Sequence, residues 1–164
     1  MAKLIVGAGI GNYIDSLEKL ADASDEMIGK AIFAGANVVT NKIRSAVSAL
    51  PVESSKAVAA AGGKMTGVSS TQKAGLLSGL GISHMQLHDG NHDVKVGFDG
   101  YNRTKTERWP NGQPNAMIAR SLESGTSFRA KNPIISKATR ASKDEAEQAM
   151  AKAFDNELEA RINF

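Results

Sequence analysis

The peptide SDEMIGKAIFAGANVVTNKIRSAVSAL, residues 24–50, is the longest patterned stretch of this chain, and Pro51 follows it directly. Its apolar residues recur at helical spacing, which is typical of one buried stripe on an α-helix. The stripe comprises Ile28, Ile32, Val39, Ile43, Val47 and Leu50, with Ala31, Ala36 and Ala46 between them. Ser24 or Asp25 can cap the start, and Pro51 ends the helix because the residue before a proline disfavours helical geometry. We therefore predict one long central helix.

A second long helix is predicted near the C-terminus. Ser142 precedes Asp144 and Glu145, and acidic residues favour the first turn of a helix. The apolar stripe of this helix reads Ala146, Met150, Phe154, Leu158 and Ile162. Shorter helices are predicted over residues 10–21 and 115–124.

A β-hairpin is predicted between these helices, because alternating apolar residues flank the peptide DGNH at residues 89–92. With residues 90–91 at the centre of the turn, Leu87 faces Val94 on the apolar side of the hairpin.

These elements predict an α+β fold: a small antiparallel β-sheet with a hairpin, packed by one long central helix and a C-terminal helix. We treat residues 1–164 as a single domain. Residues 51–79 and 99–114 are predicted to be extended loops, and loops of that length are usually functional or mobile. They are therefore the parts of the chain free to reach a neighbouring molecule.

Composition excludes several classes of protein. The 164 residues are 41% hydrophobic and 23% charged, and they include no cysteine. Disulfides, thiolate metal sites and cysteine nucleophiles are thus excluded, which fits a protein made in a reducing cytoplasm. No run approaches the roughly 20 apolar residues of a membrane span, and the N-terminus lacks the zones of a signal peptide. We expect no membrane partner.

Charge is distributed unevenly along the chain, whose formal net charge is +3. Residues 125–143 contain five bases and no acid, whereas residues 144–164 contain six acids and two bases. The five bases are Arg129, Lys131, Lys137, Arg140 and Lys143. Two interpretations stay open: charge-complementary contact with another copy or an acidic partner, or two solvated faces of opposite sign.

Motifs for chemistry are weak. The peptide GAGIG at residues 7–11 resembles a dinucleotide fingerprint, but Asn12 stands at the position of the third glycine, and the region where a second strand should follow is predicted to be helix. Three histidines and two aspartates lie in and near the predicted hairpin. They are His84, His88, His92, Asp89 and Asp93. The hairpin would hold His84 well away from the tip, apart from the others. There is no G-x-S-x-G elbow, and we expect neither an enzyme nor a bound cofactor or metal.

Nucleic-acid binding is the alternative function. The basic segment 129–143 could contact phosphates, while Tyr101 and Trp109 could stack on bases. A net charge of +3 is low for such a protein.

The string PNAMIARSLESGTSFRAKNPIISKA, residues 114–138, resembles the signature of the gene-ten-type head–tail proteins of long-tailed bacteriophages. A helix ending near Glu123 is followed by Gly125-Thr126-Ser127, then by Arg129 and Pro133. From the residues themselves, Gly125 can adopt a backbone conformation barred to others and so end the helix, and Pro133 fixes the next turn.

This resemblance implies a non-enzymatic virion protein made in the bacterial host. It implies a cyclic homo-oligomer of six or twelve copies at the neck or the top of the tail. Adjacent partners would be head-closure or connector proteins and tail-terminator or tail-tube proteins, with DNA passing through the ring.

Interaction residues are expected in the loop 99–114 and in the basic segment. They are Tyr101, Arg103, Lys105, Arg108, Trp109, Arg129, Lys131, Lys137 and Arg140. Trp109 is either an anchor for a neighbouring subunit, since large amphipathic side chains dominate interfaces, or a lid over its own domain.

Overall fold

In this computed structural model, the structure describes residues 23–89 and 91–162. The predicted helix 10–21 and the peptide at residues 7–11 lie outside the described residues. The long central helix is confirmed as α2, Ser24–Ser48. Its N-cap is Ala23 and no side chain among the described residues caps it, so the predicted capping by Ser24 or Asp25 is wrong.

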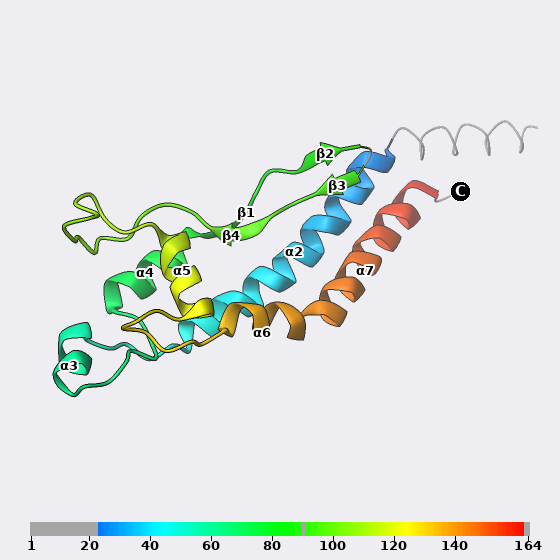
Figure 1. The fold of residues 1–164 in the computed structure, drawn as a ribbon. Helices are drawn as coiled ribbons and strands as arrows, with labels where there is room; N and C mark the ends of the chain where they lie inside the picture. Colours follow the sequence, from blue (N-terminus) through cyan, green and yellow to red (C-terminus); the bar gives the residue numbers. More distant parts are fainter. Residues whose placement is uncertain (1–22, 90, 163–164) are drawn as a thin grey trace, which may run out of the picture.

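Helix α2 is the axis of an α+β fold, as predicted (Figure 1). The β-hairpin lies along one face of α2, and the last two helices lie along the opposite face. The strands are β1 Leu80–Ile82, β2 Gln86–His88, β3 Asn91–Asp93 and β4 Val96–Phe98. The other helices are α3 Ser55–Ala60, α4 Ser70–Gly79, α5 Asn115–Ser124, α6 Ile134–Ala141 and α7 Lys143–Ile162.

The hydrophobic core sits at the C-terminal end of α2, where α4, α5, α6 and β1 converge. Its least accessible members come from distant parts of the chain: Val47, Val68, Leu76 and Leu122 are each 0% exposed. Burying a side chain of this size stabilises the fold by about 1.5–3 kcal/mol. The predicted helix 115–124 coincides with α5, which supplies Leu122.

The hairpin forms with a different register from the predicted one. Leu87 pairs with His92, not with Val94, and His88 pairs with Asn91, so the predicted turn centre at residues 90–91 is wrong. Asp89, which follows β2, has a positive φ of 50°, a conformation that aspartate tolerates in turns. Strand β3 packs on α2 while β2 lies on the outer side, so Leu87 is 60% exposed.

Residues 51–79 are not one extended loop as predicted, because they contain α3 and α4. Helix α4 begins with a capping box. The Ser69 hydroxyl accepts from the Gln72 N–H at 3.2 Å, and the Ser69 N–H donates to Gln72 Oε1 at 3.3 Å. The spacing S-x-x-Q was the sequence signal for this helix.

The C-terminal region forms two helices joined at Ser142, which is fully buried. Helix α7 runs antiparallel to α2 through small residues: a Cβ on Gly35 would lie 2.5 Å from Met150 Cγ. Ala146 is the buried residue of α7, and Phe154 is 36% exposed, so Phe154 is wrongly placed in the predicted stripe. No helix among the described residues is long and apolar enough to cross a bilayer.

Candidate interaction surface

Residues 99–114, called the finger below, project from the end of the molecule that holds α4 and α5 (Figure 1). The finger is a stem with a turned tip, not an extended loop. The Asn102 N–H donates to the Gln113 carbonyl at 2.9 Å, and Tyr101 forms an antiparallel bridge with Pro114. These contacts join the two arms of the finger at its base.

Two buried asparagines fasten this base. Asn102, 3% exposed, donates its Nδ2 to the Gln113 carbonyl at 2.9 Å and accepts from the Thr104 N–H at 2.9 Å. Asn115, 2% exposed, donates its Nδ2 to the Asp99 carbonyl at 2.8 Å. Buried amides that are paired in this way fix a backbone in one geometry. The base is therefore a defined platform for the residues beyond it.

A glycine and a side-chain pair complete the platform. Gly112 has a φ of +115°, and a Cβ there would lie 2.2 Å from the Asn102 carbonyl oxygen. Only glycine fits this close approach. Gln72 Nε2 of α4 donates to Gln113 Oε1 at 2.9 Å, which ties the finger to the helical body.

The tip of the finger is a tight turn that holds the only tryptophan of the chain. The Thr106 and Trp109 backbones exchange hydrogen bonds of 3.0 and 3.2 Å. The Arg108 guanidinium lies 5.7 Å from the centre of the Trp109 ring, within the range of a cation–π contact. Trp109 is half-buried and Tyr101 is 68% exposed.

These two aromatic side chains border a cavity of about 390 Å³, together with Pro110, Asn111 and Gly112. The finger also carries one exposed acid, Glu107, and three exposed cations: Arg103, Lys105 and Arg108. Among the described residues, none of the three pairs with a carboxylate. Of the five finger residues that the sequence predicted as interaction residues, Tyr101 and Trp109 border this cavity, and contact of all five with a partner stays a prediction.

The Gly-Thr-Ser turn has the predicted geometry at Gly125. This residue follows the last residue of α5 with a φ of 74° and a ψ of 169°. Thr126 closes the turn, because its N–H donates to the Arg129 carbonyl at 2.9 Å and its hydroxyl accepts from the Arg129 N–H at 3.1 Å. Ser127 is exposed. Pro133 directly precedes α6, as predicted.

Glu123 has a role that the sequence did not reveal. Its carboxylate caps the start of α6 by accepting from the Ile135 N–H at 2.8 Å, from the Ser136 N–H at 3.3 Å and from the Ser136 hydroxyl. A carboxylate at a helix N-terminus is favourable because it satisfies free N–H groups and faces the positive end of the dipole. Glu123 thereby fixes the angle between α5 and α6.

Arg129 was predicted to be an exposed contact residue, and the structure corrects this. Its side chain is 2% exposed, donates to the Gly67 carbonyl, and donates to Gln72 Oε1 at 3.1 Å. Burial lowers the pKa of Arg129, while the nearby Glu53 carboxylate opposes that shift. A side chain so enclosed cannot reach a partner, and it instead ties the Gly-Thr-Ser turn to the start of α4.

The rest of the basic segment stays on the surface. Lys131, Lys137 and Arg140 are exposed, and Lys143 lies 3.8 Å from Glu147 within α7. This segment therefore retains separate surface charges on the turn and on α6, rather than one concentrated basic groove.

Acids of α7 pair partly with α2 of the same chain. Glu145 lies 3.0 Å from Lys42, and Glu157 lies 2.9 Å from Lys30. Arg161 NH2 lies 3.1 Å from Glu26 at the other end of the same seam. Part of the acidic charge of α7 is therefore neutralised within the same molecule, and less of it remains for a charge-complementary contact between copies.

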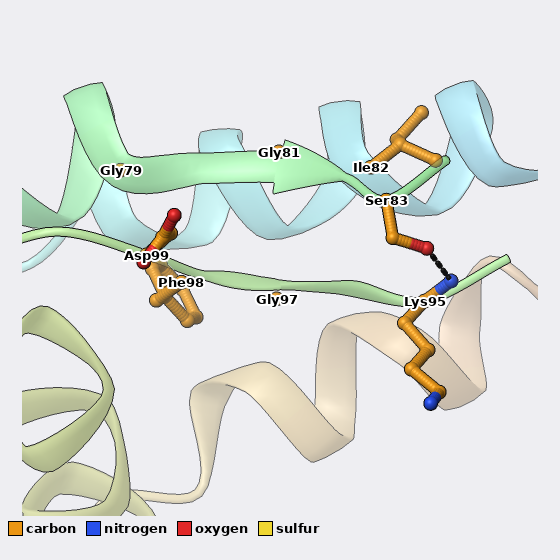
Figure 2. A pocket seen from close by; sticks show the side chains of 8 residues that line it. All are labelled: Gly79, Gly81, Ile82, Ser83, Lys95, Gly97, Phe98 and Asp99. Carbon is orange, nitrogen blue, oxygen red and sulfur yellow. Dashed lines mark hydrogen bonds between the residues drawn. The ribbon is translucent and has the colours of Figure 1, made fainter.

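A second cavity, of about 440 Å³, lies on the outer face of the β1–β4 ribbon (Figure 2). Gly81 pairs with Gly97 at its centre, and a Cβ on either glycine would meet no atom within 4 Å. Its charged side chains, Asp99 and Lys95, lie at opposite ends of the cavity. Within residues 23–89 and 91–162, no three His, Cys, Asp or Glu side chains gather as a metal site.

Comparison with known proteins finds no matching family model, no matching curated protein and no matching solved structure.

Proposed function

We propose that this chain is a non-enzymatic structural subunit that assembles side by side with copies of itself into a closed ring. The ring would belong to the virion of a tailed bacteriophage, at the neck or the top of the tail, where it completes the tail and joins it to the head. Its further partners would be the adjacent head-closure or connector protein and the tail-terminator or tail-tube protein.

The observation that carries the proposal is the anchored finger. Buried Asn102 and Asn115 order the base of the finger, which carries Tyr101 there and Trp109 at its tip. The finger also holds three exposed cations that pair with no carboxylate among the described residues. Ordering a polar protrusion costs conformational entropy, and contact with another surface is the common use of such a feature. Tyr, Trp and Arg are also the residue types that dominate the energetics of interfaces.

The placement at the head–tail junction, and six- or twelve-fold closure, depend on the resemblance of residues 114–138 to the gene-ten-type proteins. What supports this part is the geometry of that segment: Gly125 ends α5, Glu123 caps α6, and the two helices keep a fixed angle. The nucleic-acid alternative is weakened because Arg129, the first base of its segment, is buried.

The test is native mass spectrometry of the purified full-length chain, with negative-stain electron microscopy of the same sample. We expect closed rings of one copy number. Replacing Trp109 with Ala should weaken assembly, whereas Phe154→Ala, an exposed aromatic on α7 outside the finger, should not. A chain that is monomeric in solution and in purified phage particles would contradict the proposal, as would turnover of a substrate.

A further inference from the structure

The molecule carries two unlike surfaces at opposite ends of its long axis (Figure 1). One is the finger, beyond α4 and α5. The other is the hairpin tip, defined here as Leu87 and Asp89 with the adjoining Asp25 of α2, beside the N-terminal end of that helix. A contact between two different patches at opposite ends of a subunit is what a head-to-tail ring requires.

The hairpin tip is apolar at one point and acidic around it. Leu87 is a large aliphatic side chain that is 60% exposed. Asp89 is exposed in the turn, and the Asp25 side chain is 77% exposed where it lies 3.4 Å from His92 Nε2. The tip thus carries one exposed leucine and two exposed acids.

The finger offers the complement of each feature. Its cavity of about 390 Å³ lies between Tyr101 and Trp109, and it is large enough for one aliphatic side chain. Arg103, Lys105 and Arg108 lie exposed on the same finger, without carboxylate partners among the described residues. Opposite charges around an apolar centre are the usual organisation of a specific protein interface.

We propose that the hairpin tip of one copy docks on the finger of the next copy, with Leu87 in the cavity between Tyr101 and Trp109. Asp25 and Asp89 then face the finger cations. This inference rests on the proposed ring and names the two surfaces that close it. Because the two surfaces differ, each copy has one free tip and one free finger, so the contact repeats from copy to copy and forms a ring when the rotation between neighbours closes.

Two variants test the docking, each of which disables one surface. Leu87→Asp damages the tip and leaves the finger intact, and Trp109→Ala damages the finger and leaves the tip intact. Phe154→Asp places the same new charge as the first variant on α7, away from both surfaces. Circular dichroism and thermal unfolding confirm that each variant is folded.

The assay is native mass spectrometry of each variant alone and of the two mixed in equal amounts. We expect each variant alone to be monomeric, with association weakened by at least roughly tenfold, as for a hot-spot residue. The mixture should form heterodimers but no rings, because one intact tip still meets one intact finger. Phe154→Asp should form the same rings as the wild type.

The outcomes separate the inference from the proposed function. A wild type that stays monomeric overturns both. Wild-type rings that persist in both variants, or variants whose mixture forms no heterodimer, overturn the docking and leave the ring standing. Homodimers of Trp109→Ala alone would indicate a tip-to-tip contact, which also overturns it.

Discussion

Replacing Gly125 with Ala tests whether the turn between α5 and α6 is held as described. Gly125 has a φ of 74° and a ψ of 169°, a region of backbone conformation that is essentially open only to glycine. A Cβ there would also lie 3.0 Å from the Lys131 backbone nitrogen and 3.3 Å from the Arg129 carbonyl oxygen. Backbone atoms cannot move aside as the end of a flexible side chain can.

The expected loss follows from three contributions. Backbone strain of this kind costs about 1–3 kcal/mol. Alanine lowers the entropy of the unfolded chain, which offsets about 0.4–1 kcal/mol. The close contact adds to the loss, so we expect the free energy of unfolding to fall by about 1–2.5 kcal/mol. For a chain of this size, that corresponds to roughly 2–10 °C in the unfolding midpoint.

The assay is urea unfolding followed by far-ultraviolet circular dichroism, with Gly97→Ala as the matched control. Gly97 lies in β4, and a Cβ there would meet nothing within 4 Å. The control should change stability by less than about 0.5 kcal/mol. If the two variants unfold at the same urea concentration as the wild type, with the same slope, the turn at Gly125 is not constrained as argued.

Three further variants address the same region, each measured by urea unfolding. Arg129→Ala should lower the free energy of unfolding by about 2–4 kcal/mol, because the Gly67 carbonyl and Gln72 Oε1 lose a charged donor. The control Arg140→Ala, at an exposed position, should change it by less than about 0.5 kcal/mol. Equal effects of the two variants would contradict the burial of Arg129. Glu123→Ala should cost about 0.5–2 kcal/mol through loss of the α6 cap, and an unchanged midpoint would show that the cap does not matter. Hydrogen bonds from Thr66 and Gly67 lower the pKa of Glu53 below its usual value of 4.5. The contribution of the Glu53 carboxylate to the stability of the fold is therefore complete above pH 4.5 and is lost as the pH falls through the lowered pKa. Glu53→Gln should be less stable than the wild type at neutral pH, and the difference should shrink in acid. A difference that is the same at every pH would refute this.

The sequence predicted the long helix and α5 well because both have local signals. A periodic stripe and a following proline define α2, and α5 ends at a glycine that no other residue type would replace. The five finger residues lie on the surface segment where the sequence placed them, and their contact with a partner stays a prediction. The anchoring of the finger by Asn102 and Asn115 was not predicted, because nothing in the sequence distinguishes a buried asparagine from an exposed one.

The errors have physical causes. Arg129 was read as a surface cation because its acceptors, Gly67 and Gln72, come about 60 residues earlier in the chain and no pattern connects them. The hairpin register was wrong by two residues because the DGNH peptide contains two possible turn centres. Gly35 was not counted in any stripe, since hydrophobic periodicity ignores glycine.

The small-residue seam between α2 and α7 has a consequence for how the molecule opens. Of α7, Ala146 alone is buried, and the ion pairs that flank the seam are partly exposed to water. The core at the other end, around Leu76 and Leu122, does not depend on α7. Local unfolding should therefore detach α7 from α2 before the rest of the molecule unfolds. This opening would expose the surface of α2 at Gly35, while the finger and its platform stay folded.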